Sequence, residues 1–400
     1  MDTTTSLNFT AIKHIDSKEL TVVWDLGRRC TYDCSYCTPH WHNNFSPFVT
    51  KEHFFETAKN IIEYGNMLNT YRKEHVPTSL SFTGGEPTIT PGFFDWTKKL
   101  RELYPDKKQL RLGLTTNGCY SKKNVIQIIN NFNNVTISYH PSATNEQKAL
   151  VLENIKICKE KSFTMKVNLM MDKHYWNECI DLTKYFDNIG IKYVPRIIGD
   201  GSNTIEKRTT QLYNDEQMKW FKNYWQSKKQ VTNDCGTCNT NTKLGRPCCR
   251  QDTMELKINN EWQAGTFVPH TNFNQWHCMI NWFFLHVNSE FDYFTFHQTC
   301  EVNIKNKIGS NGKLSRLNDF TSKIKNMLEN DSMPIIKCPK AHCGCGLCAS
   351  KALHKEDLEP IIQEQYKIKP NFTEKFVDRK GFELWEIQDR MESRYGGILK

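Results

Sequence analysis

The stretch Arg29-Cys30-Thr31-Tyr32-Asp33-Cys34-Ser35-Tyr36-Cys37 decides how this chain folds and where its chemistry lies. It follows the apolar segment 21–26, which predicts a buried strand, so the cysteines occupy the loop after that strand. Each iron of a 4Fe–4S cube takes one protein ligand, and three thiolates therefore leave one iron open. The alternative is a structural zinc site, which takes four protein ligands and would need His40 or His42 as the fourth.

A second motif follows a second predicted strand. Residues 79–83 read Ser-Leu-Ser-Phe-Thr, and Gly84-Gly85-Glu86-Pro87 comes directly after them. Adjacent glycines allow the backbone to approach a ligand closely and to adopt positive φ angles. The alternative interpretation is an ordinary Gly-Pro turn.

Together the two motifs resemble those of the radical S-adenosylmethionine (radical SAM) enzymes, in which an aromatic residue, here Tyr36, precedes the last cysteine. The resemblance implies that Cys30, Cys34 and Cys37 hold a 4Fe–4S cluster whose open iron chelates the methionine moiety of SAM. It also implies that Gly84, Gly85, Glu86 and Pro87 contact the methionine amino group through their backbone. In that family an electron from the cluster cleaves the sulfonium, and a 5'-deoxyadenosyl radical then abstracts a substrate hydrogen.

The first half of the chain alternates strand and helix patterns. Strands are predicted near residues 21–26, 79–83, 111–115, 134–139, 164–171 and 191–198. Such repeats predict an α/β fold with a parallel sheet covered by helices, because parallel neighbours need crossover connections. The resemblance makes this a partial (β/α)6 TIM-like barrel rather than a doubly wound sheet. In both architectures the chemistry lies at the carboxyl ends of the strands.

Polar residues stand in or directly after the later predicted strands. A polar side chain inside a buried strand is costly unless it is paired, so each of them needs a partner. The resemblance implies that they contact the ribose or the methionine carboxylate of SAM; they are Asn117, Ser138, Asn168 and Arg196. The alternative is that they bond loop backbone or solvent. His140 fits a substrate contact equally well and is left out of this set.

The second half of the chain is rich in cysteine. Residues 281–287 and 293–297 predict a β-hairpin that brings Cys278 and Cys300 near one another, and a Cys-rich loop follows. This resembles the SPASM and Twitch auxiliary-cluster domains of radical SAM enzymes, although the hairpin is longer and lacks the usual turn glycine. The resemblance implies an auxiliary cluster held by Cys278, Cys300 and two of Cys338, Cys343, Cys345 and Cys348.

A separate group of cysteines precedes the hairpin: Cys235, Cys238, Cys248 and Cys249. Their spacing suits a small zinc knuckle or a share in a second iron–sulfur cluster, and free thiols are the alternative. The expected domains are an N-terminal extension (1–20), the barrel (21–200), a helical linker (201–234), the Cys-rich SPASM/Twitch-like domain (235–350) and a C-terminal helical tail (351–400).

Composition narrows the class of protein. The chain has no run of eighteen apolar residues and no signal-peptide pattern at its start, which predicts no membrane span. Sixteen cysteines in such a chain indicate metal clusters rather than disulfides and predict a cytoplasmic protein. The net charge of +9 comes without an arginine-rich run, which favours a solvated basic surface over a nucleic-acid site; an acidic peptide partner would suit the charge equally well.

The two motifs predict a radical SAM enzyme, and the resemblance to family members with auxiliary-cluster domains implies that it modifies a peptide or protein by crosslinking, epimerisation or oxidation. Its electrons would come from an external donor of the flavodoxin or ferredoxin type. A small-molecule dehydrogenase or cyclase is the alternative within the family, and a non-catalytic iron–sulfur electron-transfer or sensor protein is the alternative outside it. Gly84-Gly85-Glu86-Pro87 disfavours the latter, because an electron carrier needs no site for a methionine amino group.

Overall fold

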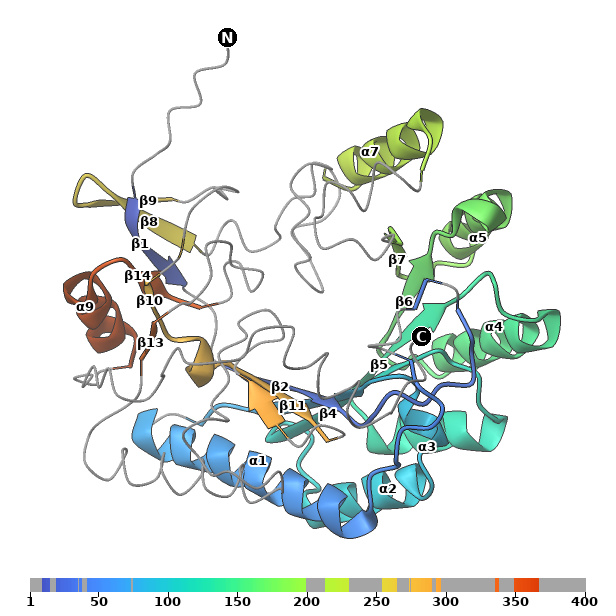
Figure 1. Cartoon of the computed structure of the whole chain (residues 1–400), viewed down its shortest axis with the longest axis horizontal. Helices are drawn as coiled ribbons and strands as arrows, with labels where there is room; N and C mark the ends of the chain where they lie inside the picture. The colour runs from blue at the N-terminus through green and yellow to red at the C-terminus, as the bar shows by residue number, and fades with distance from the viewer. Residues whose placement is uncertain are drawn as a thin grey trace, which may run out of the picture.

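The computed structural model describes residues 9–14, 19–34, 36–37, 42–72, 75–198, 213–229, 254–264, 273, 275–289, 293–295, 335–337 and 349–366. These residues form an eight-stranded, mainly parallel sheet with helices on its outer face, and a separate six-stranded sheet (Figure 1). The predicted α/β class and the partial TIM-like barrel are confirmed.

The barrel sheet contains all six strands that the alternating pattern predicts. They are β2 (Leu20–Asp25), β3 (Thr78–Thr83), β4 (Leu110–Thr116), β5 (Asn134–Tyr139), β6 (Met165–Met170) and β7 (Tyr193–Arg196). Consecutive strands pair in parallel from β2 to β7. Their carboxyl ends therefore meet at one edge of the sheet, where the loops carry the predicted site.

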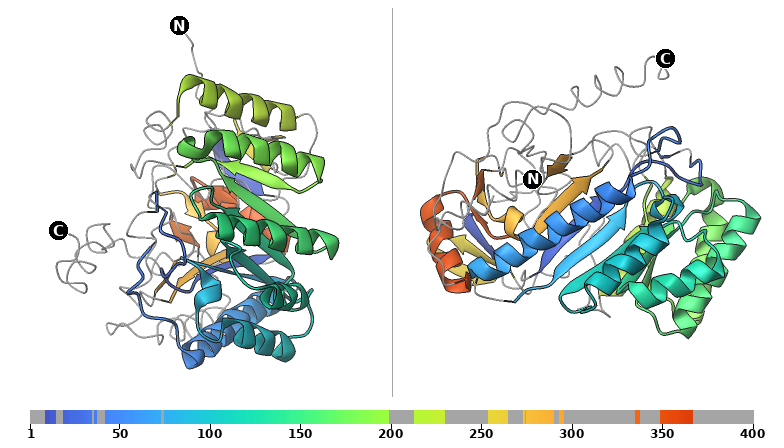
Figure 2. Two further views of the ribbon diagram at one scale, coloured as in Figure 1. Left: turned by 90° about the vertical axis from the view of Figure 1, so that its right-hand side faces the viewer. Right: turned by 90° about the horizontal axis from the view of Figure 1, so that it is seen from below.

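Helices cover the outer face of this sheet (Figures 1 and 2). They are α1 (Lys51–Arg72), α2 (Phe93–Leu103), α3 (Lys122–Asn131), α4 (Asn145–Glu160) and α5 (Trp176–Asn188), with the short η1 (Pro87–Ile89) and η2 (Lys173–Tyr175). Strand side chains alternate: Val167 and Leu169 of β6 are fully buried in the core, whereas Lys166, Asn168 and Met170 project from the inner face. Beyond α5, α7 (Asp215–Lys229) contacts Trp176 through Trp220 and Phe221.

The predicted hairpin is present as β11 (Phe284–Asn288) and β12 (Tyr293–Thr295), which pair antiparallel. It lies in the barrel sheet and not in a separate Cys-rich unit, because β11 also pairs in parallel with β2 along the register Phe284↔Thr21 to Asn288↔Asp25. Leu285 and Val287 are buried. An apolar strand of this kind is stable beside β2 because both faces of the barrel sheet offer burial.

The second sheet has the strand order β13-β10-β14-β1-β8-β9. Its strands are β1 (Phe9–His14), β8 (Met254–Ile258), β9 (Glu261–Ala264), β10 (His277–Cys278), β13 (Ile336–Lys337) and β14 (Lys351–Ala352). The segment expected as an N-terminal extension thus includes a strand that lies between β14 and β8. The segment expected as a helical tail begins with β14 and continues as α9 (Lys355–Tyr366).

Cys278 belongs to this second sheet. The short helix η5 (Ile280–Trp282) separates it from β11, so the hairpin strands do not themselves carry Cys278. Arg72 of α1 donates a hydrogen bond to the Trp282 carbonyl, and its guanidinium lies 5.2 Å from the ring centre of Phe283. This contact fastens the connection between the two sheets to the longest helix of the barrel.

Candidate active site

The cysteine loop leaves the carboxyl end of β2 and begins on a buried aspartate. Asp25 Oδ1 accepts a hydrogen bond from the Gly27 amide at 3.1 Å, and its Oδ2 accepts one from Asn288 Nδ2 at 3.3 Å. The Ser289 amide donates to the Asp25 carbonyl at 3.0 Å. The start of the loop is therefore held by the far end of β11.

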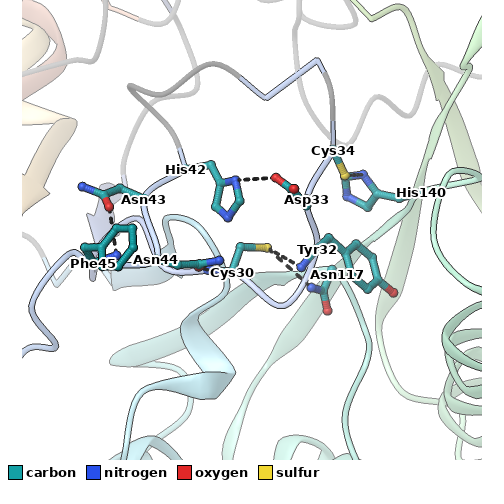
Figure 3. A network of polar contacts seen from close by, with 10 residues as sticks. All are labelled: Cys30, Tyr32, Asp33, Cys34, His42, Asn43, Asn44, Phe45, Asn117 and His140. Carbon is teal, nitrogen blue, oxygen red and sulfur yellow. Dashed lines mark hydrogen bonds and ion pairs between the residues drawn. The ribbon is translucent and has the colours of Figure 1, made fainter. Parts of the chain in front are cut away.

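The three cysteines of the loop are partly buried thiols (Figure 3). Cys30 Sγ accepts hydrogen bonds from the Tyr32 amide at 3.4 Å and from Asn117 Nδ2 at 3.8 Å. Cys34 Sγ lies 3.4 Å from His140 Nδ1, and the Cys37 amide donates to the Cys34 carbonyl at 2.9 Å. Figure 3 shows Cys34 beside His140 and Cys30 beside Asn117, and within the described ranges no three potential ligands are gathered around one point.

The chemistry of the donors nevertheless fits an iron–sulfur cube. Burial raises the pKa of all three thiols, that of Cys30 to about 11, and the negative charges of Glu86 and Cys34 act in the same direction on Cys30. A bound metal reverses this balance, since its positive charge favours the thiolate. Soft thiolates on one half-buried loop are the ligands that iron–sulfur clusters take.

The Gly84–Pro87 turn packs against the start of the cysteine loop. The Gly85 amide donates to the Gly27 carbonyl and the Glu86 amide to the Arg29 carbonyl, each at 2.7 Å. A Cβ on Gly84 would lie 2.4 Å from the Gly27 oxygen, and one on Gly85 would lie 2.2 Å from the Arg29 oxygen. Only glycine permits two backbones to approach so closely, and Gly84 also has a φ of +128°.

The carboxylate of Glu86 is buried and accepts four hydrogen bonds from the protein. Oε1 accepts from Thr88 N at 3.1 Å, Thr88 Oγ1 at 2.6 Å and Thr116 Oγ1 at 2.8 Å, and Oε2 accepts from Asn117 N at 2.6 Å. Burial raises the pKa of Glu86, and the four donors act against that shift. The side chain ties the end of β3 to the end of β4, and Pro87 next to it opens η1 and is buried.

The other predicted cofactor contacts lie directly after β4 and on β5 to β7. Asn117 Nδ2 donates to Thr31 Oγ1 at 2.9 Å, which joins the end of β4 to the cysteine loop. Ser138 and Asn168 are direct neighbours in the β5–β6 register, and Arg196 Nε donates to Asn168 Oδ1 at 3.0 Å. The structure therefore places Ser138, Asn168 and Arg196 together on the inner face.

Tyr36 and His140 form a contact that the sequence did not reveal. Tyr36 Oη lies 2.5 Å from His140 Nδ1, and the two rings are nearly parallel with their centres 6.0 Å apart. Tyr32 meets the same imidazole edge-on, and burial lowers the pKa of His140 to about 4. The only sequence signal was the position of His140 directly after a predicted strand; its partners are distant in the chain.

Cys278 is buried in β10, where it pairs with Ile336 of β13 and Lys351 of β14. The remaining predicted metal ligands lie outside the described residues: Cys235, Cys238, Cys248, Cys249, Cys300, Cys338, Cys343, Cys345 and Cys348. β13 ends directly before Cys338 in the sequence, and β14 begins shortly after Cys348. Among the helices that the structure describes, none has the length and apolar character to cross a membrane.

Comparisons with known proteins place this barrel in a family. Residues 24–209 match the family model described as the radical SAM superfamily. Among solved structures, the chain is similar to anSMEcpe with bound AdoMet and Cp18Cys peptide, at 15% identity and a TM-score of 0.40, covering 56% of this chain and 69% of that one.

It is also similar to SuiB of Streptococcus suis, at 14% identity and a TM-score of 0.41, covering 74% of this chain and 63% of that one. A further similar structure is BtrN in complex with AdoMet and 2-DOIA, at 13% identity and a TM-score of 0.23, covering 34% and 56%. No curated protein matches the sequence. Residues 24–209 form a domain of the radical SAM superfamily.

Proposed function

We propose that this chain is a cytoplasmic radical SAM enzyme that abstracts a hydrogen atom from a peptide or protein substrate. Cys30, Cys34 and Cys37 would hold the 4Fe–4S cluster, and an external flavodoxin- or ferredoxin-type donor would reduce it. The observation that carries the proposal is the pair of 2.7 Å backbone hydrogen bonds that lock Gly85 and Glu86 onto Gly27 and Arg29. They hold the cysteine loop and the Gly84–Pro87 turn side by side at the barrel mouth.

When bound, the cluster supplies the electron that cleaves SAM reductively. The protein's share is to position the loop and seclude it from water. Asp25 and the turn fix the base of the loop, and Asn117 contacts it from β4. Ser138, Asn168 and Arg196 present a hydroxyl, an amide and a guanidinium on the inner face, which are groups suited to a ribose or a carboxylate.

An auxiliary cluster is part of the proposal. Its ligands would be Cys278, Cys300 and two cysteines of the 338–348 segment. The support from the structure is that β10, which carries Cys278, lies between β13 and β14, the two strands that bound this segment in the sequence. A second metal site, iron–sulfur or zinc, would use Cys235, Cys238, Cys248 and Cys249. An auxiliary cluster can accept an electron from a substrate radical, which suits a net two-electron oxidation.

The test is the triple variant Cys30→Ala, Cys34→Ala, Cys37→Ala, reduced anaerobically with dithionite in the presence of SAM. We expect no 5'-deoxyadenosine by mass spectrometry, while the iron that the other cysteines hold remains. Cys158→Ala is the matched control, since Cys158 lies on the buried face of α4, in the core. 5'-Deoxyadenosine from the triple variant would contradict the proposed mechanism.

The substrate class is tested with the active protein. We expect 5'-deoxyadenosine formation to be slow alone and faster with the right peptide, since substrate binding completes and closes such sites. Peptides encoded beside this gene are the candidates, read out by a mass shift and by deuterium transfer into 5'-deoxyadenosine. Acceleration by a sugar, nucleotide or free amino acid, with no peptide modified, would indicate the small-molecule dehydrogenase or cyclase instead.

A further inference from the structure

A large aromatic residue stands exposed on the segment that follows the cysteine loop. Phe45 is 78% exposed, more than any other large apolar residue in the part of the chain that the structure describes. Phe48, three residues further on, is 37% exposed. Apolar side chains that gather on a surface mark sites of interaction with another molecule.

The turn that carries Phe45 is held by hydrogen bonds to the cysteine loop. The Asn43 amide donates to the Arg28 carbonyl at 2.9 Å, which fixes the start of the turn. Within the turn, the Phe45 amide donates to Asn43 Oδ1 at 2.9 Å and the Ser46 amide donates to the Asn43 carbonyl at 3.1 Å. The exposed position of Phe45 is therefore set by the backbone around it.

An arginine joins the two aromatic residues. Arg29 Nε donates to the Ser46 carbonyl, and the guanidinium carbon lies 4.4 Å from the ring centre of Phe48. A partly open pocket adjoins this pair, with Pro47 and Pro87 among its lining residues. Aromatic and arginine side chains are enriched in the cores of protein–protein interfaces. Phe45, Phe48 and Arg29 form an aromatic patch of this composition.

The aromatic patch lies next to a proposed cluster ligand. Asn44, the residue before Phe45, accepts a hydrogen bond on its Oδ1 from the Cys30 amide at 3.1 Å. Figure 3 shows Asn44 and Phe45 on one side of Cys30 and Asn117 and His140 on the other. The proposed SAM contacts are on the second side, so a protein bound at Phe45 would reach the cluster without entering the barrel.

We infer that the aromatic patch is the docking site of the electron donor, a small acidic electron-transfer protein. This inference rests on the proposed function and names where its external donor binds. The net charge of +9 attracts an acidic protein and repels a second copy of this chain. In the bound pair the reduced centre of the donor is oxidised by one electron, the oxidised cluster is reduced by that electron, and no proton is transferred.

The first test measures the Kd of two purified acidic donors, a flavodoxin and a ferredoxin, for the full-length, cluster-reconstituted chain by anaerobic biolayer interferometry. Phe45→Ala should weaken binding about tenfold, because truncation of a central aromatic anchor removes much of an interface's affinity. Phe45→Tyr, which keeps the ring, should stay within about twofold of the wild type. Leu103→Ala is the matched control, since Leu103 is 55% exposed at the far end of α2, and it should bind normally.

The second test follows reduction of the cluster by electron paramagnetic resonance in the absence of SAM. With limiting reduced donor, Phe45→Ala should be reduced about tenfold more slowly than the wild type. Dithionite needs no docking site, so reduction by dithionite, the iron content and the melting temperature should be unchanged in Phe45→Ala.

Four results would overturn the inference. They are equal donor binding by Phe45→Ala and Leu103→Ala, slower reduction of Phe45→Ala by dithionite as well, no binding of either donor to the wild type, and a wild-type dimer in light scattering that Phe45→Ala dissociates. Neither test measures 5'-deoxyadenosine, so failure here is distinct from failure of the proposed reaction.

Discussion

At the scale of single residues, the site depends on positions where no larger side chain fits. Gly85 is the clearest case, because a Cβ there would meet the Arg29 carbonyl at 2.2 Å and the Arg28 carbonyl at 2.6 Å. Both obstacles are backbone atoms and cannot rotate away. The functional importance of Gly84-Gly85-Glu86-Pro87 could be predicted from the sequence. The backbone atoms that leave no room for a side chain at Gly85 could not, because they belong to the distant cysteine loop.

We expect Gly85→Ala to displace the cysteine loop. Overpacking of this kind costs about 1–3 kcal/mol, and a shift of about 1 Å at a reacting centre can reduce a rate about 100-fold. The variant should melt earlier, retain less iron and form little 5'-deoxyadenosine. Gly190→Ala is the control: its φ of +65° adds strain, but the nearest atom to its Cβ is 3.7 Å away, so iron content should be unchanged. Wild-type iron content and activity in Gly85→Ala would show that the cysteine loop accommodates the added methyl group, and would contradict this prediction.

Lys166 makes a pH-dependent contribution to stability. Its pKa of about 8 lies below the 10.5 of an unperturbed lysine, so folding disfavours its charged form. The charged lysine therefore lowers the free energy of unfolding. This destabilisation is complete below pH 8 and disappears as the pH rises towards 10.5. Lys166→Met should therefore raise the melting temperature at pH 7 and raise it less at pH 10. The exposed Lys192→Met is the control, and an equal effect of Lys166→Met at both pH values would contradict this explanation.

At the scale of secondary-structure elements, β1 joins the two halves of the second sheet. It separates the trio β13, β10 and β14 from the pair β8 and β9. Ala11 is fully buried and pairs with Ala352 on one side and Lys257 on the other. Six residues near the N-terminus thus hold together segments that are more than two hundred positions further along the chain.

Ala11→Glu should break this junction. A buried carboxylate without a partner costs several kcal/mol, so amide exchange should accelerate in β8 and β14 while β5 stays protected. Hydrogen-exchange mass spectrometry measures each strand separately. Thr10→Glu is the control, because the side chain of Thr10 is only half-buried, whereas that of the adjacent Ala11 is fully buried. Loss of protection in β5 as well would mean that both sheets unfold as one unit.

At the scale of the whole molecule, the local sequence pattern predicted the strands of the barrel. It did not predict which strands pair when they lie far apart in the chain. The strands β2 to β7 could be located because their apolar residues alternate and each is followed by a helix. The hairpin was also recognisable, but its partner was not: no local signal indicates that Phe284–Asn288 pairs with β2. The same reason explains why the partners of Glu86 and His140 were not predicted: Thr116 and Asn117 at the end of β4 donate to Glu86, and residues of the cysteine loop contact His140.

The pairing of β11 with β2 has a consequence for synthesis on the ribosome. Translation at about 5–20 residues per second delivers Asn288 on the order of 10 to 50 s after Asp25. Throughout that interval the nascent barrel exposes the edge of β2, and an open strand edge is a template for aggregation. The hydrogen bond from Asn288 to Asp25 also forms only at the end of it. The iron-loading machinery therefore meets a fully anchored cysteine loop only after nearly three quarters of the chain has been translated.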